Sequence, residues 1–388
     1  MHVVDISALY SPNGGGIRTY TERKLRMAAD YGVRLTVVAP GPEDGIREFG
    51  PARLVMVRSP RFPLDRNYCH FADHRVIHQA LDALAPDFVE CSSPWGSARA
   101  VADWPGTAPR ALVMHAEPMS AWVYRYLDGW FTRSTIDHQF EWFWRYLRGL
   151  DARFDLVVTA APSVTLRLKQ HGLHHLVEAP LGVEGGVFSP TLRDNGLRAA
   201  LLAECSLPAE ATLALAIGRL SPEKQWPLVI AGVAAAGHQL PIGLVLLGDG
   251  HGRAAVERAI AGNPHIRILP PLVDRGAYAR TLASSDLLIH GCAAETFGLA
   301  CAEATASGLP MIVPDEGGAG DQLAHGCGLA YRAGDVTSLA AAIIAAAPRL
   351  VEWQAIAGSR AAAVPTMAAH FEALFSRYRT VKAQAQAA

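Results

Sequence analysis

The stretch "LLIHGCAAETFGLACAEATASGLPMIVP", residues 287–314, contains a complete strand–loop–helix–strand pattern. Its two ends, "LLIHG" and "PMIVP", are short apolar runs that lack the polar–apolar alternation of a half-exposed strand. The segment between them has the length of a helix, and Gly308 stands where a glycine commonly ends one. Short, wholly apolar strands separated by helices are typical of parallel sheets that are covered on both faces.

The same pattern runs along the whole chain in two series. In the first half we expect strands at "HVVDI", "RLTVVAP", "RLVMV", "DFVEC", "RALVMH" and "FDLVVTA". In the second half we expect them at "LALAIG", "IGLVLLG", "IRIL", "LLIHG", "PMIVP" and "GLAYR". The Gly- and Pro-rich segment "APLGVEGGVFSPTLRDNG" lies between the series and lacks helical or strand periodicity. The sequence therefore predicts an α/β fold of two doubly wound, Rossmann-like domains, residues 1–180 and 181–365, facing each other across a cleft.

Composition excludes several classes of protein. The chain has 388 residues, 50% hydrophobic and only 18% charged, which argues against disorder. A net charge of −1 gives no reason to expect a nucleic acid partner. The six cysteines form no C-x-x-C pair, so reduced core cysteines are expected rather than a zinc site or disulfides. The start of the chain does not resemble a signal peptide, and no run of about 18 apolar residues occurs. A cytoplasmic location is expected.

A glycine-rich loop, "SPNGGGIRTY", follows the first expected strand and opens the first helix. Glycines such as Gly15 and Gly16 let the backbone approach a ligand closely, and a helix start offers N–H groups to an anion. Dinucleotide binding would need G-x-G-x-x-G and an acidic residue after the second strand, and this chain has neither. The loop is therefore either a phosphate contact, best placed at Gly16, or a tight turn.

A pair of cations follows the first strand of the second series, in "AIGRLSPEKQWPLVIAGV". Arg219 and Lys224 flank a turn that begins at Gly218, at the carboxyl end of a strand. A guanidinium and an ammonium suit a diphosphate and the charge that develops on it as a leaving group. The alternative is a solvated turn in which Glu223 pairs with Lys224.

Two glutamates stand eight positions apart around the helix of the opening stretch. Glu295 is expected in the loop before the helix, and Glu303 about one and a half turns inside it. A carboxylate can accept hydrogen bonds from neighbouring hydroxyls, so Glu303 suits a ribose and Glu295 a sugar. The N–H groups of Phe297, Gly298 and Leu299 lie at the positive end of the helix. The alternative is an acid that complements the helix dipole and one surface glutamate.

Together these motifs resemble those of the retaining glycosyltransferases of family 4, which have the GT-B fold. The resemblance rests on "GGGIRTY", "APLGVEGGVFSP", "GRLSPEK", "LLGDGHGRAAVE" and "ETFGLACAEATASGLPMIVP", in that order along most of the chain. It implies transfer of a hexose from a nucleoside-diphosphate sugar with retention of configuration. It also implies a front-face mechanism that needs no metal or cofactor, and no D-x-D motif occurs.

The resemblance also implies roles for single residues. Glu303 would bind the nucleotide ribose and Glu295 the hydroxyls of the donor sugar. Arg219 and Lys224 would neutralise the diphosphate, and Gly16 would donate its N–H to it.

His115, in "LVMHAEP", matches a family histidine that touches the donor sugar; the alternative is a core histidine. Phe297, Gly298 and Leu299 would present main-chain amides. The last helix, about 366–388, would return to the first domain.

Two segments depart from the family pattern. "IHGCAAE" replaces the more usual proline–serine before the first glutamate, and "DEGGAGDQL" is an unusual form of the following glycine loop. Both belong to the expected donor pocket, so the donor, GDP-mannose or a UDP-sugar, stays open.

Aromatic and arginine residues alternate over residues 122–148 in what is expected to be one helical region. Such a segment suits a membrane surface or a groove for a lipid acceptor, and the alternative is ordinary core. "WRYLRGLDARFDLVVTAAPS" resembles the family branch of lipid α-mannosyltransferases and sulfolipid synthases. A lipid or glycan acceptor at the inner face of the cytoplasmic membrane is the leading expectation. A GT-B-like nucleotide-sugar epimerase and a non-catalytic nucleotide-sugar-binding protein are the two other hypotheses.

Overall fold

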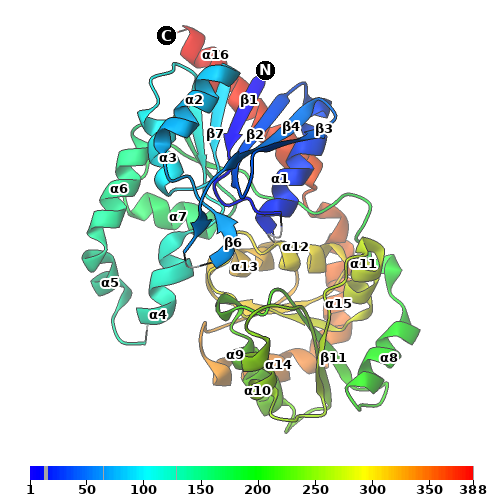
Figure 1. The fold of residues 1–388 in the computed structure, drawn as a ribbon. Helices are drawn as coiled ribbons and strands as arrows, with labels where there is room; N and C mark the ends of the chain where they lie inside the picture. Colours follow the sequence, from blue (N-terminus) through cyan, green and yellow to red (C-terminus); the bar gives the residue numbers. More distant parts are fainter. Residues whose placement is uncertain (13–15, 64, 128, 388) are drawn as a thin grey trace. The chain divides into compact units, whose positions relative to one another are not determined.

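The computed structural model describes residues 1–12, 16–63, 65–127 and 129–387. The chain forms two compact units, which are described separately. Unit 1 comprises Met1–Pro118, Tyr126–Pro180 and Ala368–Ala388, and unit 2 comprises Met119–Arg125 and Leu181–Met367. Each unit contains one large sheet with helices around it, as the sequence predicts for an α/β fold (Figure 1).

The sheet of unit 1 has eight strands in the order β10-β9-β8-β7-β1-β2-β4-β3. They are β1 (His2–Ile6), β2 (Arg34–Gly41), β3 (Gly45–Phe49), β4 (Ala52–Arg58), β7 (Phe88–Cys91), β8 (Arg110–Val113), β9 (Leu156–Thr159) and β10 (Leu176–Glu178). All neighbours pair in parallel except β3, which pairs antiparallel with β4. A separate two-stranded ribbon joins β5 (Arg61–Phe62) and β6 (Asp65–Cys69). The expected strands are confirmed, and the edge strands β3 and β10 and the ribbon β5–β6 are additions to them.

The helices of unit 1 include the last helix of the chain. They are α1 (Gly16–Met27), η1 (Ala28–Tyr31), α2 (His74–Leu84), α3 (Gly96–Asp103), α5 (Arg133–Gln139), α6 (Glu141–Asp151), α7 (Pro162–Gln170) and α16 (Met367–Ala387). The short helix η2 (Met119–Tyr124) belongs to unit 2, and α4 (Arg125–Leu127) begins in unit 2 and ends in unit 1. From α16, Phe371, Phe375 and Tyr378 are buried, and the Tyr378 ring stacks on Phe88 of β7 with 4.2 Å between centroids. An aromatic face of α16 is therefore part of the core of unit 1.

The sheet of unit 2 has six parallel strands in the order β13-β12-β11-β14-β15-β16. They are β11 (Thr212–Ile217), β12 (Ile242–Leu247), β13 (Ile266–Leu269), β14 (Leu287–Ile289), β15 (Met311–Pro314) and β16 (Gly328–Tyr331). Successive residues of β11 belong to different core clusters: Ala214 to the one that contains Trp226 and Leu339, and Leu215 to the one that contains Tyr278 and Leu282. Both faces of the strand are thus apolar, which explains the absence of alternation in the sequence.

Helices cover both faces of this sheet. They are η3 (Pro190–Leu192), α8 (Asn195–Glu204), η4 (Pro222–Lys224), α9 (Trp226–Ala236), α10 (Arg253–Ile260), α11 (Arg275–Ser284), α12 (Leu299–Ala306), α13 (Gly317–Asp321), η5 (Gln322–Ala324), α14 (Val336–Ala346), η6 (Ala347–Arg349), α15 (Leu350–Arg360) and η7 (Ala361–Ala363). Gly308 has a φ of +70° just after α12, so it ends this helix in the left-handed conformation, as predicted.

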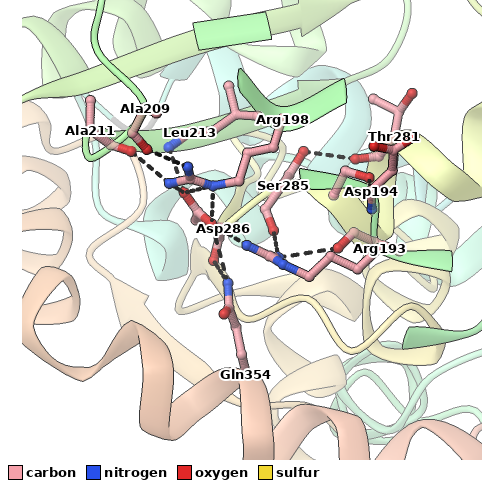
Figure 2. A network of polar contacts seen from close by, with 12 residues as sticks. Arg193, Asp194, Arg198, Ala209, Ala211, Leu213, Thr281, Ser285, Asp286 and Gln354 are labelled. Carbon is pink, nitrogen blue, oxygen red and sulfur yellow. Dashed lines mark hydrogen bonds and ion pairs between the residues drawn. The ribbon is translucent and has the colours of Figure 1, made fainter. Parts of the chain in front are cut away.

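Asp286, just before β14, is the centre of a polar network (Figure 2). Its carboxylate accepts hydrogen bonds from Arg193 Nη2 at 2.9 Å, from Arg198 Nη2 at 2.6 Å and from the backbone N–H of Leu213 at 2.9 Å. Burial alone would raise the pKa of Asp286, but these hydrogen bonds hold it below its usual value. The network fixes the end of the Gly- and Pro-rich segment and α8 to β11 and to the start of β14.

One helical stretch of the described chain, Val336–Ala363, is long and apolar enough to cross a membrane by length and composition. Its Leu339, Ile343 and Trp353 belong to the core of unit 2. A helix that packs in a protein core passes the same test, so the stretch is weak evidence for a membrane span.

Candidate functional site

Lys224 and Glu295 form an ion pair beyond the carboxyl ends of β11 and β14. Lys224 ends η4, and Glu295 lies in the loop between β14 and α12; Lys224 Nζ contacts Glu295 Oε1. The two side chains are 19% and 22% exposed. Burial alone would raise the pKa of Glu295, but the Lys224 ammonium holds it well below its usual range. Both groups are therefore charged at neutral pH, and solvent reaches both.

Gly218 makes room for the lysine of this pair. Its φ is +149°, and a Cβ at this position would lie 3.2 Å from Lys224 Cε. Arg219 follows and is 60% exposed; its Nη2 lies 3.3 Å from Glu223 Oε1. Glu223 also accepts a hydrogen bond from Ser221 Oγ at 2.5 Å. Lys224 thus pairs with Glu295 across the turn, and Arg219 presents its guanidinium to solvent.

His290 lies directly behind this pair, at the end of β14. Its side chain is 4% exposed, and its Nε2 is 3.5 Å from Glu295 Oε1 and makes no hydrogen bond. The hydroxyl of Tyr331 donates to the His290 carbonyl at 3.1 Å, which fixes the backbone here. Burial lowers the pKa of His290, so its imidazole is neutral near pH 7.

Glu303 is buried inside α12 and has two defined partners. Its Oε1 accepts a hydrogen bond from Arg275 Nη2 at 2.7 Å, and its Oε2 accepts one from the Tyr278 hydroxyl at 2.7 Å. It is 5% exposed, so the interpretation as a surface glutamate is wrong. Each carboxylate oxygen has two lone pairs, and therefore Glu303 keeps acceptor capacity for hydroxyl groups.

Arg275 and Tyr278, both of α11, are residues that the sequence analysis missed. Arg275 Nε also lies 3.3 Å from Glu184 Oε2, and its guanidinium lies over the rings of Phe188 and Tyr278 at 5.1 and 4.9 Å. One signal was available. An arginine in the first turn of a helix opposes the helix dipole, so Arg275 needs a carboxylate partner elsewhere.

The helix α12 starts two residues later than the sequence predicts. The helix begins at Leu299, and its N-cap residue Gly298 has a φ of +81°. A Cβ at Gly298 would lie 3.0 Å from the Cα of Ala319, so only glycine fits. Phe297 is buried, and its carbonyl accepts a hydrogen bond from Gln322 Nε2 at 2.8 Å.

Three predicted site residues, Gly15, Gly16 and His115, belong to unit 1. Gly16 begins α1, and a Cβ there would meet nothing within 4 Å; Gly15 lies outside the described residues. His115 follows β8 and is packed against Tyr20, with ring centroids 4.8 Å apart. Burial lowers the pKa of His115 to about 4, so this imidazole is neutral. The other predicted residues all belong to unit 2.

The aromatic region is not one helix, because it is divided among η2, α4, α5 and α6. Its aromatic side chains divide as well. Phe143 and Trp144 are buried, and the Trp144 ring stacks on His171 at 3.6 Å. Four others are exposed: Tyr126 (61%), Trp130 (83%), Phe131 (55%) and Trp142 (62%). The interpretation as ordinary core is therefore correct for some aromatic residues of the region, whereas the four just named are exposed.

Family profiles match both halves of the chain. The profile described as "Glycosyltransferase Family 4" matches residues 14–184, and the one described as "Glycosyl transferases group 1" matches residues 211–347. Among solved structures, sucrose-phosphate synthase from Thermosynechococcus elongatus has a TM-score of 0.77 at 18% identity, covering 99% of this chain and 100% of that one. The Anabaena protein HepE in complex with UDP and glucose has a TM-score of 0.67 at 16% identity, covering 100% of both chains.

Two curated relatives are similar over most of their length. A GDP-mannose-dependent alpha-(1-6)-phosphatidylinositol dimannoside mannosyltransferase of Mycobacterium tuberculosis is 28% identical, over 81% of this chain and 79% of the relative. A GDP-mannose-dependent alpha-mannosyltransferase of Mycolicibacterium smegmatis is 26% identical, over 84% of this chain and 82% of the relative. The chain belongs to glycosyltransferase family 4 and is a glycosyltransferase with the GT-B fold.

Proposed function

We propose that this protein transfers mannose from GDP-mannose to the sugar of a glycolipid, with retention of configuration and without a metal. The names of the two mannosyltransferase relatives support the donor and the acceptor class. Their α-linked products support retention, since the mannose of GDP-mannose is itself α-linked. The observation that carries the proposal is the solvent-accessible Lys224–Glu295 pair, which lies beside Arg219 at the carboxyl ends of parallel strands.

In this proposal residues 181–365 bind the donor. Glu303 accepts hydrogen bonds from the ribose hydroxyls while Arg275 and Tyr278 hold its carboxylate in place. The N–H groups around Gly298, at the positive end of α12, face the phosphate or a sugar hydroxyl. Glu295 accepts from hydroxyls of the mannose.

Residues 1–180 provide the acceptor side in the same proposal. Gly16, at the first residue of α1, donates its N–H to the diphosphate. His115 is neutral, so it contributes a hydrogen bond to the sugar and brings no charge.

In the proposed reaction the protein positions the donor and the acceptor and stabilises the charge that develops on the diphosphate. The bond from the mannose anomeric carbon to the diphosphate oxygen breaks, and a bond to the acceptor oxygen forms on the same face. The acceptor proton passes to the leaving diphosphate, so no protein base is needed. Lys224 moves from Glu295 to the diphosphate, and with Arg219 it stabilises the charge that develops there.

The exposed aromatic residues support a lipid acceptor and a peripheral location at the membrane. Trp130 and Trp142 expose most of their surface, and Arg145, three positions after Trp142 on α6, is exposed as well. Aromatic rings and arginines are the residues that favour a lipid–water interface. Vesicle flotation tests this part: Trp130→Ala with Trp142→Ala should reduce binding to anionic vesicles, and unchanged binding would contradict it.

The donor is tested by thermal shift with GDP-, UDP- and ADP-sugars, followed by transfer of labelled mannose into extractable lipid in EDTA. GDP-mannose should stabilise the protein most, and EDTA should not reduce transfer. NMR of the product should show an α-linked mannose. Binding of no nucleotide sugar would overturn the proposal, and interconversion of the donor without transfer would indicate an epimerase instead.

A further inference from the structure

Three side chains at the end of β14 bring together a nitrogen, a sulfur and an oxygen. His290, Cys292 and Glu295 each offer one ligand atom, and these atoms all lie within 4.8 Å of one another. His290 and Cys292 are 3% exposed each, and Glu295 connects the group to solvent. A tetrahedral zinc ion bound by such atoms needs them about 3.3–3.6 Å apart, given zinc–ligand distances of about 2.0–2.3 Å. His290 Nε2 and Glu295 Oε1 are already 3.5 Å apart.

A second observation concerns the weak hydrogen bonding of His290 inside this group. The Nε2 atom of His290 is buried and makes no hydrogen bond, although it faces the Glu295 carboxylate. An unsatisfied buried polar atom costs about 1–3 kcal/mol, so it calls for an explanation. A neutral imidazole nitrogen with a free lone pair is the form that binds a metal ion.

The backbone holds these ligands closely against the turn of Lys224. A Cβ at Gly291, between the histidine and the cysteine, would lie 2.5 Å from the Lys224 carbonyl oxygen. The carbonyl of His290 is held by Tyr331 on β16. The two buried ligands are therefore fixed by a strand end rather than carried on an open loop.

We propose that His290, Cys292 and Glu295 form an inhibitory site for zinc or a similar borderline transition metal ion. One histidine, one cysteine and one carboxylate are a ligand set that suits zinc, with the fourth position open to water. Binding replaces the proton of the Cys292 thiol, which passes to solvent, by the metal–sulfur bond.

Inhibition follows because the metal and Lys224 compete for the same atom. Lys224 Nζ contacts Glu295 Oε1, which is also the oxygen nearest to His290 Nε2. A bound dication repels the ammonium and removes Glu295 from the donor sugar. This consequence rests on the proposed transferase function, whereas metal binding itself does not.

Cobalt(II) provides a direct readout of the site, since a cobalt–thiolate bond gives a charge-transfer absorption band. The reduced full-length protein, cleared of metal with a chelator and desalted, should bind one equivalent of cobalt with this band, and zinc should abolish it. Cys292→Ser should remove the band, and His290→Ala should weaken cobalt affinity at least tenfold. Cys301 of α12 is a matched buried cysteine, so Cys301→Ser should keep both the absorption band and the cobalt affinity. Persistence of the band in Cys292→Ser, or no saturable cobalt binding, would overturn the site.

Activity then tests the inhibition separately. Zinc should raise the KM for the nucleotide sugar of the wild-type protein, and this effect should be lost in Cys292→Ser but not in Cys301→Ser. Cobalt binding without any effect of zinc on transfer would overturn the inhibitory role. A protein that binds cobalt as described but transfers no sugar would overturn the proposed function and leave the metal site standing.

Discussion

Each unit pairs a lysine with a carboxylate near the carboxyl ends of its strands, but the two clusters differ in access to solvent. In unit 1, Lys24 of α1 pairs with Asp5 of β1 and Glu90 of β7, and all three are at most 1% exposed. In unit 2, Lys224 and Glu295 are 19% and 22% exposed. We call the buried group of Lys24, Asp5 and Glu90 the sealed cluster, and the solvent-accessible pair of Lys224 and Glu295 the open cluster.

The two clusters also differ in how completely their polar groups are hydrogen-bonded. In unit 1, Ser92 donates to Asp5 at 2.8 Å, and Tyr378 of α16 donates to Glu90 at 2.8 Å. A buried charge network with several donors serves the fold, because no ligand can reach it. In unit 2 the pair keeps its solvent contact, and a buried histidine beside it has an unsatisfied nitrogen. Accessibility and incomplete satisfaction, rather than charge, distinguish the proposed binding site from the sealed cluster.

The largest effect should come from the sealed cluster. Lys24→Met leaves the carboxylates of Asp5 and Glu90 buried without their cation. Removal of one partner from a buried ion pair costs about 3–5 kcal/mol, so we expect a loss of that size in the free energy of unfolding. Urea denaturation measures it, with Arg26→Met, an exposed cation of the same helix, as the control. A loss as small as that of the control would mean that the cluster contributes little to stability.

The open cluster should respond in activity instead. Lys224→Ala removes a cation from the proposed diphosphate site, and loss of one such group lowers kcat by about 10²–10³-fold. Because Lys224 is near the surface, the melting temperature should change less than in Lys24→Met. Arg332→Ala, an exposed cation of unit 2, provides the control. Wild-type activity in Lys224→Ala would contradict the proposed site.

The contribution of Asp5 to the free energy of unfolding should depend on pH. Burial raises the pKa of Asp5 to about 6, against the lowering effect of Lys24; Glu90 and Tyr20 face the same group. The folded protein therefore holds this proton more tightly than the unfolded chain. Its stabilising contribution is full below the usual pKa of 3.8 and is lost as the pH rises through about 6.

The amide introduced by Asp5→Asn does not titrate, so the unfolding free energy of this variant should rise relative to that of the wild type as the pH increases. The difference in unfolding free energy between the two proteins should shift by about 1–3 kcal/mol in favour of Asp5→Asn from pH 4 to pH 7. Urea titrations at both pH values measure the shift. A shift in the opposite direction would mean that Lys24 outweighs burial at Asp5.

The sequence predicted the open cluster better than the sealed one. Arg219, Lys224 and Glu295 follow strand ends, where ligands bind in parallel sheets, so position along the chain together with the family resemblance singled them out. The ion pair between Lys224 and Glu295 was not predicted. Lys24 lies in "TERKLRM", which is indistinguishable from a solvated helix face. Its burial depends on Asp5 and Glu90, which lie opposite each other on the neighbouring strands β1 and β7.

The fold itself was predictable wherever strands were buried on both faces, as for β11 and β14. The edge strand β3, "GIREF", was missed because it is exposed and pairs antiparallel, so it carries neither an apolar run nor a following helix. Arg275 and Tyr278 were missed for another reason. They reach Glu303 through the packing of α11 on α12: the place of Arg275 in the first turn of a helix indicates that it needs a carboxylate partner, but no local pattern identifies Glu303 as that partner.

The smallest effect we predict tests whether Glu303 is open to a ligand or complete like the sealed cluster. Tyr278→Phe removes one donor from Glu303 and keeps the ring that packs beside Arg275. If Glu303 binds the ribose, the KM for the donor should rise about three- to tenfold, which is the size of one hydrogen bond. The preference for the normal nucleotide over its 2′-deoxy form should fall as well. Tyr331→Phe loses a comparable buried hydroxyl, which donates to the His290 carbonyl, and should keep that preference. If both variants keep it, Tyr278 and Glu303 form a structural pair, and the ribose is bound elsewhere.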